Sequence, residues 1–160
     1  VSLVYLGFGI GGPLFGFFAD RSQQYYKAMQ LGLILALLCL CPIIYFQISS
    51  HWLLDSLLIG FGLGTGAFML GFTVAKSTNP LFLAATIVAF INTGDAFFFS
   101  FPKPLIGKLL DINHSHQVTS TTTLFTLSNY HIAFAILPLY LCLAWLFLSV
   151  VSNKRHAPPV

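Results

Sequence analysis

The sequence contains few charged residues. Lysine and arginine together number 7, aspartate and glutamate together number 4, and charged residues make up 7% of the 160 positions. Soluble domains carry roughly 25% charged residues. A water-soluble globule with so few charges could not cover its surface with polar groups, so we expect much of this surface to face lipid.

Cysteine is also scarce, and its placement excludes a disulfide framework. Cys39, Cys41 and Cys142 all lie within apolar runs and form no C-x-x-C pair. We expect them to be buried small hydrophobic residues. His114 and His116 form an H-x-H pattern without a third ligand, which makes a poor metal site. We therefore expect no metal site and no cofactor.

A patch or stripe of basic residues is missing as well. Lysine and arginine lie at the ends of apolar runs, which argues against nucleic acid as a partner. No Ser-His-Asp or Cys-His order lies at a consistent depth, so we do not expect an enzyme. Two classes of membrane protein remain: transporters of a solute, and scaffold or assembly subunits without a transport activity.

Long apolar stretches are what the sequence has in abundance. They cover residues 1–18, 28–48, 53–75, 81–110 and 130–151. Each is long enough to cross a bilayer as a helix, and backbone groups in lipid must be satisfied within the segment. The sequence therefore predicts an all-α integral membrane protein, a multi-pass helical bundle of about five transmembrane helices over residues 1–151. Residues 152–160 are expected to form a cytoplasmic tail.

The positions of lysine and arginine indicate the orientation. One side of the predicted bundle collects Arg21, Lys27, Lys76, Lys154 and Arg155. Cytoplasmic loops carry an excess of such residues, so this side and the C-terminus should be cytoplasmic. The loops around residues 49–52 and 111–129 should then lie outside. We expect a multi-pass protein of the cell membrane, specifically a bacterial inner membrane.

Glycines near the start match a nucleotide-binding pattern, but they fit a membrane helix better. Gly7, Gly9 and Gly12 match G-x-G-x-x-G, yet Pro13 follows directly and no acidic residue stands about 20 residues further on. Small residues four positions apart instead let membrane helices approach closely. Such pairs are Gly7 with Gly11, Gly12 with Gly16, Gly60 with Gly64 and Gly62 with Gly66. Whether that packing is static or permits movement stays open.

Residues 16–27, "GFFADRSQQYYK", resemble the loop motif of the major facilitator superfamily. That motif is a glycine, three residues, Asp-Arg, a second glycine two positions further on, and then basic residues. Gly16, Asp20 and Arg21 match, whereas Gln23 stands at the second glycine and Lys27 alone remains of the basic residues. The resemblance implies that the five helices are helices eight to twelve of a twelve-helix major-facilitator fold.

Residues 79–111 are similar to the eleventh helix of the same family, with a closing "PLIGKLLD". The similarity extends to a bacterial metabolite and phagosomal-transporter branch, in which glutamine is frequent at the position of Lys103. The family resemblance implies that Gly16, Asp20 and Arg21 form a conformational latch at the cytoplasmic end of two helices. The alternative is a solvated charge pair that only fixes topology.

Asp95 lies about midway through the fourth apolar stretch, where a carboxylate is costly unless it is paired or protonated. Asn92, Phe99 and Pro102 share a helix face with it by the i, i+3, i+4, i+7 rule. We expect Asp95 to line a central cavity and to take part in substrate binding or proton coupling, and Asn92 to hydrogen-bond a polar substrate. The alternative is a structural aspartate that is capped by Asn92 or Thr93 or paired with Lys103.

Lys103 follows Asp95 by eight residues, roughly 12 Å along a helix axis, so the two are not expected to pair within one straight helix. It stands between Pro102 and Pro104, where the helix is expected to break near the outer surface. Lys103 either attracts an anionic substrate group or extends its ammonium to the lipid headgroups.

These features predict part of a secondary active transporter, a symporter that moves a small polar metabolite with protons by alternating access. The chain starts with valine, and we expect it to be cut from a larger protein whose N-terminal half is missing. The expected partners are that half, the lipid bilayer and a small-molecule substrate. The alternative is a non-catalytic multi-pass membrane scaffold or assembly subunit.

Overall fold

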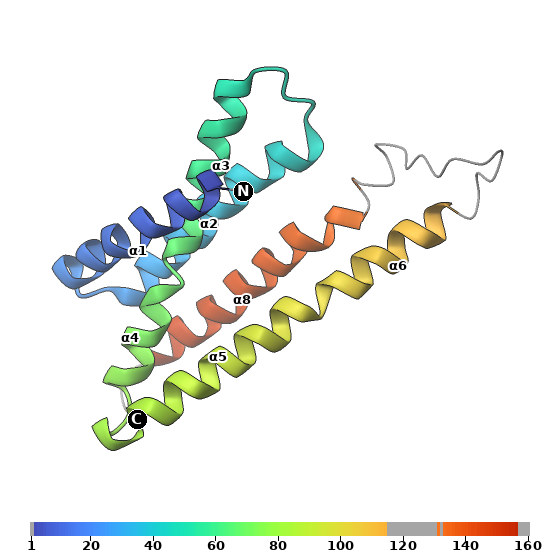
Figure 1. The fold of residues 1–160 in the computed structure, drawn as a ribbon. Coiled ribbons are helices and arrows are strands. Elements are labelled where there is room, and N and C mark those ends of the chain that lie inside the picture. The colour runs from blue at the N-terminus through green and yellow to red at the C-terminus, as the bar shows by residue number, and fades with distance from the viewer. Residues whose placement is uncertain (1, 115–130, 132, 157–160) are drawn as a thin grey trace.

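The computed structural model describes residues 2–114, 131 and 133–156. Within these residues the regular elements are all helical, and no strand occurs among them, as the composition predicts. Figure 1 shows the helices in order. They are α1 (Ser2–Ser22), α2 (Tyr25–Tyr45), α3 (His51–Gly66), α4 (Met69–Ser77), the short 3₁₀ helix η1 (Leu81–Leu83), α5 (Ala84–Ser100), α6 (Pro102–His114) and α8 (Ile136–His156).

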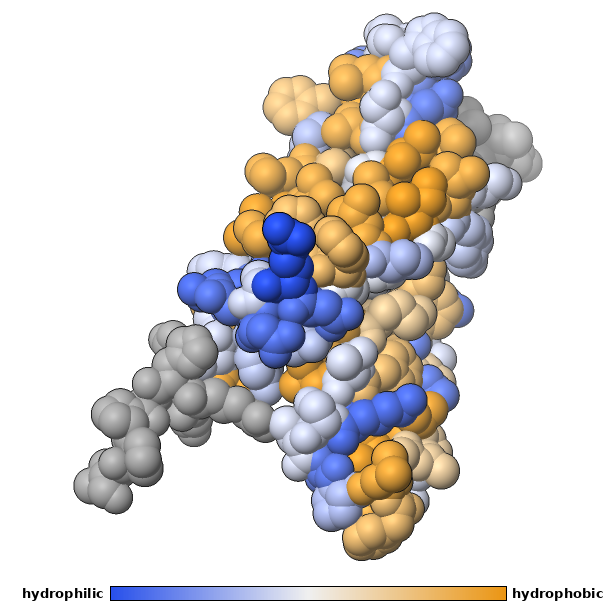
Figure 2. Space-filling view, turned by 90° about the vertical axis from the view of Figure 1, so that its left-hand side faces the viewer, coloured by the Kyte–Doolittle hydropathy of each residue, from blue (hydrophilic) through white to orange (hydrophobic). Residues whose placement is uncertain are grey.

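Four helical stretches of the described residues are long and apolar enough to cross a membrane. They are Ser2–Ser22, Tyr25–Tyr45, His51–Ser77 and Leu81–Lys108, and α8 adds a shorter apolar stretch at Ile136–Ser152. Large apolar side chains are exposed along all of them, and Figure 2 shows one face on which apolar side chains cover most of the upper part. Lipid covers such a surface without cost, so the structure is consistent with a multi-pass membrane protein.

The helix bounds differ from the sequence prediction at several places. α1 continues to Ser22 and α2 begins at Tyr25, so the first connection is only Gln23 and Gln24. α8 continues to His156, through the first part of the predicted tail. The predicted outer loop over 111–129 begins later, since α6 runs to His114. Residues 115–130 and 157–160 lie outside the described residues.

Two predicted single spans are each interrupted once. Between α3 and α4 the backbone tightens, because the Ala67 and Phe68 amides bond to carbonyls three residues back, at 3.3 and 3.0 Å. Between α5 and α6 the break falls at Phe101, since Pro102 has no N–H to bond the carbonyl four residues before it. Phe101 itself keeps right-handed helical angles, and Figure 1 shows α5 and α6 following one direction.

Helix α3 is the centre of the packing and contacts α1 and α2 more extensively than any other helices contact each other. Its glycines make both contacts possible. A Cβ atom at Gly62 would collide with the Val4 carbonyl oxygen of α1, and one at Gly66 would lie 2.6 Å from the Gly12 nitrogen. A Cβ atom at Gly64 would lie 2.6 Å from the Ala36 nitrogen of α2. Gly62 and Gly66 therefore face α1, and Gly60 and Gly64 face α2. The helix backbones come into direct contact at Gly62, Gly64 and Gly66.

The glycines of α1 divide into two groups. Cβ atoms at Gly7 and Gly11 would collide with backbone carbonyl oxygens of α3, so close packing is confirmed for this pair. A Cβ atom at Gly12 would meet the Met69 side chain at 3.6 Å and the Gly66 carbonyl oxygen at 4.0 Å, whereas one at Gly16 would have no neighbour within 4 Å. The prediction that this pair brings a helix into close contact is confirmed at Gly12, whose backbone nitrogen would lie 2.6 Å from a Cβ atom at Gly66. It is wrong at Gly16, because α3 has already ended where α1 reaches that residue.

Helix α8 packs on α2. The Gln30 side-chain amide of α2 donates a hydrogen bond to the Ser149 hydroxyl of α8 at 3.3 Å. At the other end of α2, the ring of Tyr45 lies 6.2 Å from that of His131, which precedes α8 in the chain. The rod formed by α5 and α6 lies at the edge of the structure, and α5 has no buried residue. Its ring contact to α8, between Phe98 and Tyr140, has a centroid distance of 6.4 Å.

Candidate functional site

The turn between α1 and α2 holds the residues that match the loop motif. Asp20 and Arg21 are exposed in the last turn of α1. The hydroxyl of Tyr25, the first residue of α2, donates a hydrogen bond to the Asp20 carboxylate at 2.8 Å. A charged acceptor makes this a comparatively strong bond. Asp20 thus links the ends of two helices, a contact that the sequence motif did not indicate.

Gln23 has a left-handed backbone, with φ of 55°, and is the one non-glycine residue in the described part of the chain with positive φ. This is the position at which the loop motif has its second glycine. Its side-chain amide donates a hydrogen bond to the Asp20 carbonyl oxygen at 2.7 Å. The backbone therefore has the conformation that glycine adopts without strain, although glutamine stands there.

We expect Gln23→Gly to leave the turn intact and Gln23→Val to open it. Glycine relieves the strain of the left-handed backbone, roughly 1 kcal/mol, but it loses the hydrogen bond from the Gln23 side chain to the Asp20 carbonyl oxygen. The two effects on stability nearly cancel. A β-branched side chain is far less compatible with positive φ. Limited proteolysis of the purified protein at the turn measures this. Equal cleavage of the glycine and valine variants would contradict the left-handed assignment.

The turn rests on a small apolar cluster. Ala19 of α1, Ala28 of α2 and Leu70 of α4 are buried together, and Phe15 and Met29 pack against them. Three helices therefore meet beneath the Asp20–Tyr25 hydrogen bond. Figure 2 shows a group of hydrophilic side chains below the mainly apolar upper part of this face. The position of Asp20 is consequently determined by packing as well as by the turn.

Asn92 and Asp95 are both exposed on α5. The Thr93 hydroxyl between them donates to the Ala89 carbonyl oxygen at 2.8 Å, so Thr93 is satisfied within its own helix and does not cap Asp95. Asn92 lines an open hollow between α4 and α5, together with Lys76, Ala84, Ala85, Val88 and Ala89. Asp95 does not line it. The structure thus places Asn92 and Lys76 around the same hollow, whereas the sequence had indicated Lys76 only as an orientation signal.

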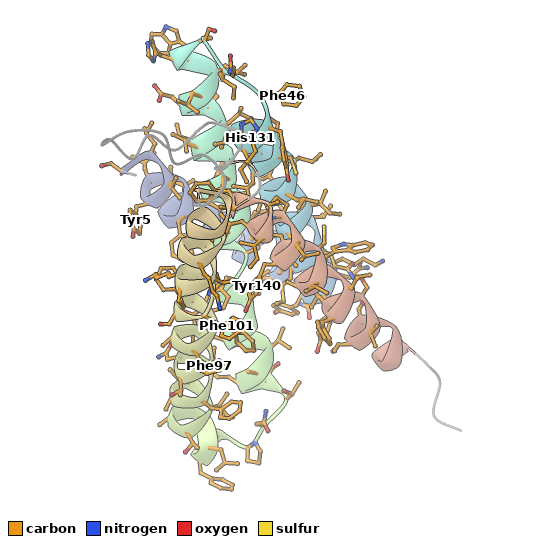
Figure 3. All side chains as sticks on the ribbon, turned by 90° about the vertical axis from the view of Figure 1, so that its right-hand side faces the viewer. Tyr5, Phe46, Phe97, Phe101, His131 and Tyr140 are labelled. Carbon is orange, nitrogen blue, oxygen red and sulfur yellow. The ribbon has the colours of Figure 1, made fainter. Side chains whose placement is uncertain are left out.

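Lys103 lies over an aromatic ring, which neither of the sequence interpretations anticipated. Its ammonium is 4.1 Å from the centroid of the Phe99 ring, a cation–π contact. Phe99 is one helical turn before Lys103 and one turn after Asp95, so the ammonium is drawn back along the helix toward Asp95. Figure 3 shows the neighbouring Phe97 and Phe101 on the same rod, with Tyr140 of α8 close by.

The cysteines are free thiols of unequal burial. Cys39 is buried, Cys41 is half-buried and Cys142 is exposed, so the prediction of burial is wrong for Cys142. No group of three or more potential metal ligands occurs within the residues that the structure describes. His114 lies at the end of α6, whereas His116 lies outside the described residues.

Comparisons with known proteins add no identification. No family model matches the chain, and neither the curated proteins nor the solved structures contain a significant match. The interpretation of the site therefore depends on the residues and their geometry.

Proposed function

We propose that this chain is the C-terminal part of a secondary active transporter of the major facilitator type, which moves a small polar metabolite with protons. The observation that carries the proposal is the α1–α2 turn. Gly16, Asp20 and Arg21 match the motif, the backbone is left-handed at the position of the missing glycine, and Asp20 is bonded to the next helix. A hydrogen bond between charged and polar groups at two helix ends can form in one state and break in another.

The packing supports a division of the helices into a closely packed group and a loosely packed one. Helix α3 contacts both α1 and α2 backbone to backbone through glycines, whereas α5 contacts its neighbours sparsely and buries none of its residues. Alternating access requires parts that move as rigid bodies against others. We infer that the three-helix unit is one such body and that α5 borders the path of the substrate.

The exposed Asp95 supports a polar pathway. It lies within a stretch long and apolar enough to span the membrane. A carboxylate in that position is stable when it faces water or other protein rather than lipid. A path lined by Asn92 and Asp95 supplies such an environment, and a proton carried by Asp95 would couple the transport to a gradient.

The experiment that tests the function is uptake by the full-length protein in proteoliposomes, with a panel of ¹⁴C-labelled small polar metabolites. We expect saturable uptake driven by an inward proton gradient. Tyr25→Phe and Asp20→Asn should each slow uptake severalfold by weakening the turn, while Lys27→Gln, an exposed charge beside the same turn, should not. Specific binding of a metabolite without any uptake would favour the scaffold alternative instead.

A further inference from the structure

The hollow between α4 and α5 has the size of a small-molecule site. Its volume is about 430 Å³, and it is bordered by Lys76 near the end of α4 and by one face of α5. Pockets for small ligands measure roughly 300–1,000 Å³. The α5 face runs from Ala84 to Asn92, roughly 12 Å along the axis at ~1.5 Å per residue. The hollow is open on one side and has room for a small metabolite.

Among the residues that the structure describes, Lys76 is the one titratable side chain that lines the hollow. The carbonyl groups at the end of α4 do not need its ammonium. The Ser77 and Thr78 hydroxyls donate to the Val74 oxygen at 3.0 and 2.9 Å, and the Asn79 amide donates to the Ala75 oxygen at 2.8 Å. With these carbonyls already bonded, the positive charge of Lys76 is available to a ligand in the hollow.

The other lining groups favour a particular kind of anion. Ala84, Ala85, Val88 and Ala89 present small apolar side chains, and Asn92 supplies a single amide at the far end. One ammonium balances one negative charge, so a carboxylate fits better than a doubly charged phosphate, which would need further donors. The small apolar wall leaves room for a short carbon skeleton.

We infer that this hollow is the cytoplasmic end of the substrate path and that it selects a small organic monocarboxylate, with Lys76 binding the carboxylate. The inference rests on the proposed transport function and names its substrate class. The small apolar residues between Lys76 and Asn92 contact the carbon skeleton, and Asn92 offers a hydrogen bond to a polar substituent at the other end of a longer substrate.

The test is thermal unfolding of the full-length protein in detergent, with n-butyrate as the probe. Butyrate should raise the unfolding temperature, and the neutral isostere butyramide should not, because only butyrate carries the charge that Lys76 binds. Lys76→Gln should weaken the apparent affinity for butyrate roughly tenfold or more, as expected for loss of a hydrogen bond to a charged group. Ala89→Leu, which keeps the charge and fills the hollow, should weaken it as well.

Matched variants keep this test decisive. Lys76→Arg retains the charge and should retain the effect of butyrate, and Lys27→Gln removes an exposed charge outside the hollow and should retain it too. Equal stabilisation by butyrate and butyramide, or an undiminished effect in Lys76→Gln, would overturn the inference. So would stabilisation by phosphatidylglycerol in place of butyrate, since the hollow would then be a lipid site.

The outcomes also separate this inference from the function on which it rests. If butyrate binds in a Lys76-dependent manner and the proteoliposomes transport nothing, transport fails while the monocarboxylate site stands. If the proteoliposomes transport only neutral or cationic metabolites and Lys76→Gln has no effect, transport stands and the monocarboxylate inference fails.

Discussion

Gly62→Ala is expected to destabilise the helix bundle, whereas Gly9→Ala is expected to stabilise it. Both glycines lie in long helices, so alanine improves the intrinsic helix propensity by about 1 kcal/mol at either position. At Gly62 the new methyl group meets the Val4 carbonyl oxygen, which belongs to the backbone and cannot turn aside. Overpacking of this kind costs about 1–3 kcal/mol and exceeds the gain. At Gly9 no atom lies within 4 Å of the new group.

The measurement is the midpoint of unfolding as sodium dodecyl sulfate is titrated into detergent micelles that hold the purified protein. Gly66→Ala should behave as Gly62→Ala, since its methyl group meets the backbone of Gly11 and Gly12. Gly60→Ala should be milder, because its nearest neighbour is the Cys39 sulfur, at the end of a side chain that can rotate. Shifts of the same sign for Gly62→Ala and Gly9→Ala would show that α1 and α3 do not pack as described.

The glycine spacing illustrates how much of this fold the sequence can predict. Pairs four residues apart in 60–66 predict contact surfaces on α3, and the structure has them on two sides of that helix. The same spacing occurs at Gly12 and Gly16, where Gly12 lies against the backbone of Gly66 but Gly16 has no neighbour within 4 Å. The spacing of glycines shows only that they share one face of their own helix. Whether that face touches a neighbour depends on where the neighbouring helix ends. α3 gives way to α4 after Gly66, a bound that the apolar pattern over 53–75 did not mark.

The candidate site was likewise visible in part. The motif at Gly16, Asp20 and Arg21 located the turn, but Tyr25 as the hydrogen-bond donor depended on a connection of two residues, and the sequence pattern suggested a longer one. The pairing of Lys103 with Phe99 could have been anticipated, because residues four apart on a helix are neighbours. The hollow shared by Lys76 and Asn92 could not, because it depends on how α5 folds back beside α4.

Asp95→Asn in the full-length protein is expected to abolish uptake driven by a proton gradient while leaving substrate exchange largely intact. Asparagine keeps the size and hydrogen-bonding capacity of aspartate but cannot bind and release a proton. If Asp95 carries the coupled proton, net uptake loses its driving force, and its initial rate should fall to the level measured without a proton gradient. Exchange of internal for external substrate needs no net proton movement.

The control for this experiment is Asp55→Asn, the same substitution in the first part of α3, where the carboxylate is half-buried and stands apart from α5. Uptake and exchange should both survive there. Uptake and exchange are each measured across a range of external pH in proteoliposomes. A purely structural Asp95 would lose both activities together and at every pH, because the helix would be misplaced rather than uncoupled. Gradient-driven uptake that is unchanged in Asp95→Asn at all pH values would exclude this carboxylate from coupling, and the proton path would then have to run through groups other than those on α5.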